Sequence, residues 1–313
     1  MKHIFVVNTH AGKAKAKEEI ERLLVGFDSE YEVYYTKGHK DATEFARARC
    51  ERERGSDLRF YACGGDGTIK EVAEGILGFE NADLTTVPLG SGNDFVKYYG
   101  GADRFLDLKA LSEAPSEYID MIRVNDEFCI NAVNFGFESY AAKVMNDVRH
   151  KKFIGGKNSY TTGILKGLLF AMKNYARVTV EGEELIDGEY LLCSVANGRY
   201  VGGAYMCAPR ALNDDGLLEV CAVDTISRLS VPKLIKIYQA GKHLEDASFR
   251  KIIHYTRGKR VEAHFKNEMP VTLDGEMISV RDVVCEVMPR AVRFAALPVR
   301  VEDKEPENSL ARV

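Results

Sequence analysis

The first hundred residues alternate between short apolar runs and amphipathic stretches, and this alternation limits the folds that the chain can adopt. Residues 3–7, 59–63 and 84–88 have the composition of buried strands. Over residues 69–76, apolar side chains recur with the spacing of one helix face. Strands joined by helices of this length form βαβ units. The pattern therefore predicts an N-terminal α/β domain, residues 1–118, with a mostly parallel sheet.

The sequence after residue 118 is richer in strand-like runs separated by turns. Residues 190–196, 217–223 and 261–265 are examples. Two helical stretches, about 138–175 and 229–245, interrupt these runs. A chain of 313 residues is also longer than one typical domain. We therefore expect a second, β-sandwich-like domain over residues 119–300 and a flexible tail over residues 301–313.

Composition and charge exclude several classes of protein. Lys and Arg total 43 and Asp and Glu total 47, so the net charge is −4 and no global positive field attracts nucleic acid. No apolar stretch is long enough for a membrane span or a signal-peptide core, and we expect a cytoplasmic protein. The seven cysteines are widely spaced and form no C-x-x-C pair. They indicate reduced thiols packed as small apolar side chains, not disulfides or a zinc site.

A glycine-rich pentapeptide is the strongest local motif: Gly64-Gly65-Asp66-Gly67-Thr68. It lies between a predicted strand and a predicted helix, where open α/β sheets bind their ligands. Glycines let the backbone approach an anion closely, and the N–H groups at the start of the helix suit a phosphate. Asp66 suits a metal ion or a water network beside that phosphate. A plain surface turn is the alternative interpretation.

A second glycine loop follows the next predicted strand. Its residues are Pro88-Leu89-Gly90-Ser91-Gly92-Asn93-Asp94-Phe95, again ahead of a predicted helix. Because one βαβ unit separates the two loops, both should project from the same edge of the sheet. Together they predict a nucleotide crevice, to which the weaker loop at residues 8–13 would add a third wall.

Several other phosphate-binding and catalytic patterns are absent from the sequence. No Gly-Lys pair is followed by Ser or Thr, so there is no P-loop, and there is no G-x-G-x-x-G dinucleotide fingerprint. The H-R-D and D-F-G motifs of protein kinases are missing. Neither H-E-x-x-H nor G-x-S-x-G occurs. The two glycine loops must therefore be interpreted without these motifs.

Carboxylates outside the glycine loops are candidates for a phosphoryl-transfer site. Transfer to an alcohol needs a positioned phosphate, a divalent cation against the developing charge, and a carboxylate that accepts the hydroxyl proton. The candidates for the cation are Asp66, Asp120, Asp214 and Asp215, and those for the proton are Asp274 and Glu276. Residues 213–216 and 274–276 are also good turn sequences, and Asp120 is equally compatible with a plain strand edge.

Four segments in this order resemble the bacterial soluble diacylglycerol kinases, a family of lipid kinases whose catalytic domain type is shared with sphingosine and ceramide kinases. The segments are residues 64–68, 89–95, 208–219 preceded by Gly202-Gly203, and 273–276. The resemblance extends over about residues 1–295. It implies an N-terminal α/β nucleotide-binding domain, a C-terminal β-sandwich-like domain and an active site between them.

The resemblance also implies roles for individual residues. ATP would contact Asn8, Gly12, Thr36, Gly64, Gly65, Asp66, Gly67, Thr68, Ser91, Gly92 and Asn93. Asp66, Asp120 and Asp215 would join an aspartate–water–Mg²⁺ network near the transferred phosphate. A structural Mg²⁺ would be held by the Asp215 carboxylate and the main-chain carbonyls of Leu212 and Leu217. Glu276 would accept the proton of the lipid hydroxyl, with Asp274 beside it.

On this resemblance, the chain is expected to transfer the γ-phosphoryl group of ATP to a lipid hydroxyl, with diacylglycerol as acceptor and phosphatidic acid as product. The alternatives are an NAD kinase, whose family also carries G-G-D-G, and a non-catalytic nucleotide- or lipid-binding protein. Residues 89–95 favour the lipid kinases over the first alternative. The full set of phosphate, metal and base residues disfavours the second.

A basic cluster beside an apolar stretch is the candidate membrane contact. Residues 149–152 and Lys157 precede the apolar stretch 164–170, and residues 257–260 carry a second basic cluster. Such clusters can rest on an anionic bilayer, which would bring the enzyme transiently to the inner face of the membrane to meet its lipid substrate. A solvated charge run beside a core helix is the alternative interpretation. A homodimer is left open.

Overall fold

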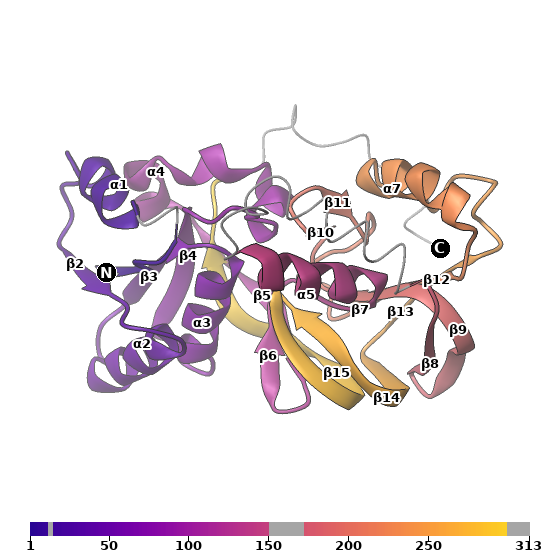
Figure 1. Ribbon diagram of the computed structural model, residues 1–313. Coiled ribbons are helices and arrows are strands. Elements are labelled where there is room, and N and C mark those ends of the chain that lie inside the picture. The colour runs from indigo at the N-terminus through magenta and orange to yellow at the C-terminus, as the bar shows by residue number, and fades with distance from the viewer. Residues whose placement is uncertain (12–14, 150–171, 299–313) are drawn as a thin grey trace.

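The structure, a computed structural model, describes residues 1–11, 15–149 and 172–298. In its N-terminal part (Figure 1), four strands pair in parallel in the order β4-β3-β1-β2. They are β1 (Lys2–Val7), β2 (Tyr31–Tyr35), β3 (Leu58–Gly64) and β4 (Ala82–Pro88). Helices α1 (Ala16–Leu23), α2 (Asp41–Arg52) and α3 (Asp66–Ile76) connect them. The predicted alternation of strands and helices is therefore present.

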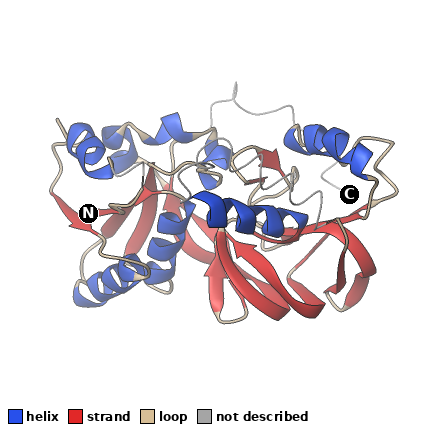
Figure 2. Cartoon of the chain, viewed as in Figure 1, coloured by secondary structure: helices blue, strands red, loops and turns tan. Residues whose placement is uncertain are grey.

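The burial of these elements follows from their sequences. Every residue of β3 is buried, as is every residue of β1 after its first. Strands that are apolar on both faces are typical of a sheet that helices cover on both sides, as Figure 2 shows here. Helix α3 buries Ile69, Val72, Ala73 and Ile76, which is the helix face that the sequence predicts.

The second part of the chain consists mainly of antiparallel strands. They are β5 (Ser116–Val124), β6 (Glu127–Cys129), β7 (Ala132–Gly136), β8 (Asn174–Val180), β9 (Glu183–Ala196), β10 (Tyr200–Val201), β11 (Tyr205–Met206), β12 (Leu218–Asp224), β13 (Ile253–Gly258), β14 (Arg260–Leu273) and β15 (Glu276–Ala295). The shorter helices are η2 (Phe95–Tyr99), η3 (Ala102–Phe105), α4 (Leu108–Glu113) and η4 (Arg228–Ser230). Several neighbours, such as β8 with β9 and β14 with β15, are joined by short turns, which only antiparallel pairs allow.

Both parts share one 13-stranded sheet, whose main path runs β13-β12-β9-β7-β14-β15-β4-β3-β1-β2. Strand β15 is the junction. It pairs antiparallel with β14 and β5, and near its end Phe294 pairs in parallel with Leu84 of β4. Val292 and Phe294 lie in the core of the N-terminal strands. Parallel pairing is thus limited to the N-terminal strands and this one junction, and the rest of the sheet is antiparallel.

Two helices pack over the strands of the second part (Figure 1). Helix α5 (Phe137–Arg149) contacts β7, β9 and β14, and α7 (Val231–Gln239) contacts β11. The helices cover the starts of the predicted stretches 138–175 and 229–245. The ends of both predictions are wrong, because residues 174–175 belong to β8 and residues 240–245 form turns. Residues 150–171 of the first stretch and the predicted tail 301–313 lie outside the described residues.

The structure bears on two features inferred from composition, the lack of a membrane-spanning helix and the state of the cysteines. None of the described helices is both long and apolar enough to cross a membrane. All seven cysteines are buried and unpaired, as the sequence predicts. Burial raises the pKa of each thiol, which keeps it protonated and unreactive.

Candidate active site

The two glycine loops lie against each other at the carboxyl ends of β3 and β4. The carbonyl oxygen of Gly64 accepts hydrogen bonds from Leu89 N–H (2.7 Å) and Gly90 N–H (3.1 Å). A Cβ atom at Gly90 would come within 2.5 Å of the Gly65 Cα atom. Only glycine permits this backbone contact, so the two loops form one continuous wall.

The end of β1 extends this wall. Asn8 donates from Nδ2 to the Thr68 hydroxyl (3.2 Å), and a Cβ atom at Gly64 would lie 2.1 Å from that hydroxyl oxygen. Thr36 follows β2 and donates its N–H to the end of β1 (2.9 Å). These four predicted ATP contacts therefore share one edge of the sheet. Gly12, also predicted to contact ATP, lies outside the described residues.

Asp66 links the first loop to the second. Its two carboxylate oxygens accept the backbone N–H groups of Asp94 and Phe95, each at 3.0 Å. Burial raises the pKa of Asp66 to about 6, and the Asp94 and Asp274 carboxylates add to the shift, whereas the two hydrogen bonds oppose it. A Cβ atom at Gly92 would lie 3.5 Å from an Asp94 oxygen and 3.6 Å from an Asp66 oxygen. Both acidic groups therefore face the second loop.

Asp94 is a site residue to which the sequence assigned no role of its own. Both of its carboxylate oxygens accept the Gly203 N–H at 3.0 Å, and it pairs with Lys97 (2.5 Å). These bonds hold the Gly202-Gly203 turn of the second part against the nucleotide loops. Asn93, the preceding residue, has a φ of +47° and donates from Nδ2 to the Gly90 carbonyl oxygen (3.0 Å).

Asp274 is enclosed by hydrogen-bond donors. Its carboxylate accepts the N–H groups of Ile130 (2.7 Å), Asn131 (3.0 Å) and Ala132 (3.0 Å), and the Cys129 thiol (3.1 Å). Burial raises its pKa, and these donors oppose the shift. The carboxylate therefore anchors the connection between β6 and β7 and has little capacity left for a lipid hydroxyl.

The Glu276 side chain lies beside the first turns of α3. Its carboxylate pairs with Lys70 Nζ (2.5 Å) and lies 3.7 Å from His39 Nδ1. The side chain is 36% exposed, so a substrate can reach it. Burial lowers the pKa of Lys70, but the Glu276 carboxylate outweighs this and raises it above its ordinary value. His39, Glu71 and Glu276 also bring three potential metal-ligating atoms within 4.8 Å of one another.

Asp120 and Asp215 lie together, in a cluster separate from Asp66. The Asp120 carboxylate accepts the N–H groups of Gly216 (2.6 Å) and Arg290 (2.7 Å). Burial raises the pKa of Asp120, and the nearby Asp215 carboxylate adds to the shift. Neither aspartate lines the pocket that Asp66 lines. Asp66 bonds instead to the second glycine loop, so no direct hydrogen bond among the described residues joins it to Asp120 or Asp215, and a shared network of water and Mg²⁺ stays a prediction.

The predicted structural Mg²⁺ does not fit the Asp215 carboxylate as it is arranged. One carboxylate oxygen accepts Leu217 N–H (3.1 Å), and the other receives the Arg257 guanidinium. Arg257 also pairs with the buried Glu219 (2.8 Å). The guanidinium supplies positive charge here, and it would repel a cation bound through the Leu212 and Leu217 carbonyls. Arg257 belongs to the second basic cluster that the sequence offers as a membrane contact, but Asp215 and Glu219 neutralise its charge within the protein.

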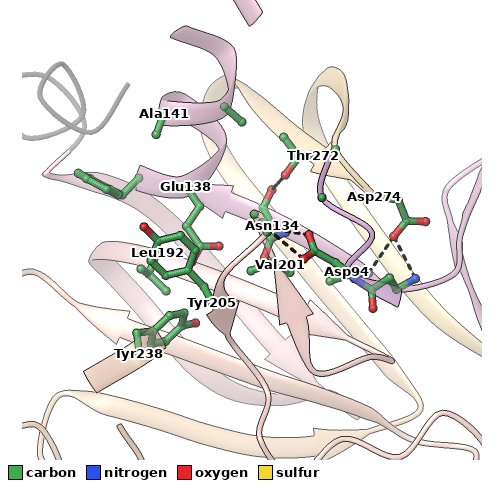
Figure 3. A pocket seen from close by; sticks show the side chains of 18 of the residues that line it. Asp94, Asn134, Glu138, Ala141, Leu192, Val201, Tyr205, Tyr238, Thr272 and Asp274 are labelled. Carbon is green, nitrogen blue, oxygen red and sulfur yellow. Dashed lines mark hydrogen bonds between the residues drawn. The ribbon is translucent and has the colours of Figure 1, made fainter. Parts of the chain in front are cut away.

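One pocket of about 480 Å³ leads from the glycine loops into the second part of the chain (Figure 3). Its polar end is lined by Asp66, Ser91, Gly92, Asp94 and Asp274, and its apolar part by Phe137, Leu191, Leu192, Val231, Leu234 and Ile235. Figure 3 shows Asp94 and Asp274 on one side and Leu192 and Tyr238 on the other. A pocket of this kind suits a ligand with a polar reacting group and an apolar body.

Known proteins resemble this chain over both of its parts. Residues 2–124 match the diacylglycerol kinase catalytic domain, and residues 131–296 match the YegS C-terminal NAD kinase beta sandwich-like domain. A probable lipid kinase YegS-like from Shewanella frigidimarina is 28% identical over 92% of each chain. A protein of the same description from Pseudomonas aeruginosa is 31% identical over 74% of each chain. The solved structure of a diacylglycerol kinase from Bacillus anthracis has the same fold, with a TM-score of 0.69 over 96% of this chain and 98% of its own, at 20% identity.

Proposed function

The chain belongs to the YegS-like lipid kinases, and we propose that it transfers the γ-phosphoryl group of ATP to the free hydroxyl of diacylglycerol, which yields phosphatidic acid. The observation that carries the proposal is the pocket that joins the glycine loops to an apolar interior. A long apolar wall next to a phosphate site suits the hydrocarbon chains of a lipid acceptor. It is a poor match for a water-soluble acceptor such as NAD.

ATP would bind along the wall formed by the two glycine loops and the end of β1. The backbone N–H groups at the start of α3 and the Thr68 and Ser91 hydroxyls are donors suited to phosphate oxygens. The close contact between Gly65 and Gly90 leaves no side chain between the phosphates and the backbone. Positioning of the phosphates is the main contribution that such loops make to phosphoryl transfer.

The neighbouring carboxylates of Asp66 and Asp94 are the oxygen ligands on offer for the Mg²⁺ that would accompany ATP, and the Lys97 ammonium that now pairs with Asp94 would have to move away. Their mutual repulsion contributes to the raised pKa of Asp66, and a divalent cation would relieve it. Mg²⁺ prefers such oxygen ligands and would neutralise charge on the transferred phosphoryl group. Asp66 would be ionised in this complex. Its hydrogen bonds to the second loop would hold the two loops together.

Glu276 would accept the proton of the acceptor hydroxyl. The hydroxyl oxygen forms the new bond to phosphorus, its proton passes to a Glu276 oxygen, and the bond to the ADP oxygen breaks. Lys70 now pairs with Glu276, and incoming phosphate oxygens would compete for its ammonium group. That competition would free a carboxylate oxygen of Glu276 for the proton.

Transient contact with the cytoplasmic face of the membrane is part of the proposal, because the acceptor resides in a bilayer. The basic and apolar segments over residues 150–170 that would make this contact lie outside the described residues. Among the described basic residues of the second cluster, Arg260 pairs with Glu262 (2.7 Å) and with Glu286. Because Arg260 is paired within the protein, the first basic cluster, residues 149–152 and Lys157, is the better candidate for contact with anionic lipid.

The direct test is transfer of labelled phosphate from ATP, with Mg²⁺, to lipids in mixed micelles. The panel contains diacylglycerol, phosphatidylglycerol, a long-chain base and a prenol, with NAD in a parallel reaction. We expect labelled phosphatidic acid, its loss in Glu276→Gln, and its retention in the surface control Glu51→Gln. Product from NAD alone would make the chain an NAD kinase. ATP binding with no transfer to any acceptor would favour a binding protein.

A further inference from the structure

A single arginine lies between two carboxylates at the start of β12. Arg257 belongs to β13 and lies directly opposite Glu219 of the neighbouring strand β12 (Figure 1). Its guanidinium pairs with Glu219 through Nε (2.8 Å) and with Asp215 through another nitrogen. Asp215 belongs to the turn ahead of β12, for which the family resemblance predicts a structural Mg²⁺. The proposed transfer reaction gives this arginine no role.

The negative charge around this turn requires a cation. The Glu219 side chain is only 2% exposed, and that of Asp215 is 21% exposed. Asp120 and Asp214 lie close enough to add to the negative potential. A buried carboxylate that loses its positive partner destabilises a protein strongly, and neighbouring carboxylates increase the cost. The fold can therefore keep these side chains together only with positive charge between them.

A divalent cation and the Arg257 guanidinium are alternative ways to supply that charge. The guanidinium already binds the Asp215 oxygen that an ion would use, and its tie to the buried Glu219 holds it there. Arginine cannot lose its charge to make room for an ion, so the two would repel each other. Its separate N–H groups also let it bond to both carboxylates at once.

We propose that Arg257 takes the place of the structural Mg²⁺ in this chain and holds the turn before β12 without a metal ion. The turn contacts the nucleotide loops, because Asn213 donates from Nδ2 to the Tyr99 hydroxyl (2.8 Å). Tyr99 ends η2, the helix that follows the second glycine loop. Arg257 is therefore a positioning residue, and the Mg²⁺ that accompanies ATP is the one that the enzyme still needs. The proposal does not depend on the identity of the acceptor.

The test compares Tm in millimolar Mg²⁺ with Tm in EDTA, without nucleotide, and the difference between them is the Mg²⁺ effect. The wild-type protein and Asp215→Asn should show the same Mg²⁺ effect, because no ion binds at Asp215. Arg257→Met should lower Tm in EDTA by about 5 °C, because Glu219 is left buried without its cation. Its Mg²⁺ effect should exceed that of the wild-type protein by most of this loss, since the freed carboxylates and main-chain carbonyls are ligands that Mg²⁺ prefers.

Three further variants show where the ion binds. Asp215→Asn combined with Arg257→Met should abolish the gain, and Arg257→Lys should show none, because its ammonium group keeps the positive charge. The control Arg281→Met removes an exposed arginine of β15 and should match the wild-type protein.

A smaller Mg²⁺ effect in Asp215→Asn than in the wild-type protein would reveal an ion at Asp215 and overturn the inference. An Arg257→Met protein whose Mg²⁺ effect equals that of the wild-type protein would overturn it as well. Should Arg257→Met fail to fold, the comparison of the wild-type protein with Asp215→Asn still decides. None of these measurements uses an acceptor, so their outcome is separate from that of the lipid kinase assay.

Discussion

At the scale of single residues, Asp274 and Glu276 show how different surroundings give two similar side chains different roles. The sequence Asp274-Gly275-Glu276 left open which carboxylate accepts the proton. The structure gives Asp274 four donors from the segment around residue 130, far away along the chain. Glu276 keeps an exposed carboxylate beside Lys70. No local pattern reveals such partners, so the sequence identified the pair but not the role of each member.

Exchanging each carboxylate for its amide separates the two roles. We expect Glu276→Gln to lower kcat by at least about 100-fold, because it removes the proton acceptor, and to lower Tm modestly, because it weakens the pair with the buried Lys70 ammonium. Asp274→Asn should cost about 2 kcal/mol of unfolding free energy, because the amide nitrogen cannot accept the N–H groups that the carboxylate accepts. Kinetics and thermal unfolding of both variants check this. A silent Glu276→Gln with an inactive, fully stable Asp274→Asn would reverse the assignment.

Glu138, in the wall of the pocket, should make the folded protein less stable as pH rises. Burial raises its pKa to about 7 in the folded protein, above the value of about 4.3 for a glutamate carboxyl in an unfolded chain. Between these values the folded protein binds more protons than the unfolded chain, so the contribution of Glu138 to stability falls as pH rises. We expect Glu138→Gln to gain about 2 kcal/mol over the wild-type protein at pH 8 relative to pH 5. Urea unfolding at both pH values measures the difference, and equal gains would show that Glu138 ionises freely.

At the scale of elements, the glycine loops were predictable because their signals are local. A buried strand, a glycine run and an amphipathic helix follow one another within about 20 residues, and parallel pairing then fixes where the loop must lie. The same reasoning predicted that both loops lie at one edge of the sheet, which is where the structure has them. It did not reveal that Asp66 binds the N–H groups of Asp94 and Phe95, because those bonds depend on the path of the second loop.

The contact between the loops gives a prediction for Gly90→Ala. Its Cβ atom would lie 2.5 Å from the Gly65 Cα atom, so the loops must move apart. We expect KM for ATP to rise about tenfold, since displaced phosphate donors lose their alignment, and Tm to fall modestly. Gly55→Ala is the matched control, because a Cβ atom there meets nothing within 4 Å. An unchanged KM in Gly90→Ala would mean that the phosphates bind elsewhere.

At the scale of the whole molecule, the sequence suggested two successive domains because composition and periodicity change near residue 118. Such patterns describe neighbours along the chain and cannot show that β15, at the far end, returns to pair with β4. They also cannot show that Arg257 will neutralise Asp215, since the two lie on different elements. One continuous sheet results, and residues of the last strand complete the first core.

Phe294 offers a test of this shared architecture. Its ring lies 5.0 Å from the rings of Phe95 and Tyr99, in the cluster behind the second glycine loop. Phe294→Ala should cost about 3–5 kcal/mol and lower a single unfolding transition. Because Phe95 N–H holds Asp66, the variant should also bind ATP more weakly. The control Leu229→Ala removes a side chain that is 92% exposed and should change neither property. If calorimetry of Phe294→Ala resolved two transitions, with one at the wild-type temperature, the two parts would unfold independently despite their common sheet.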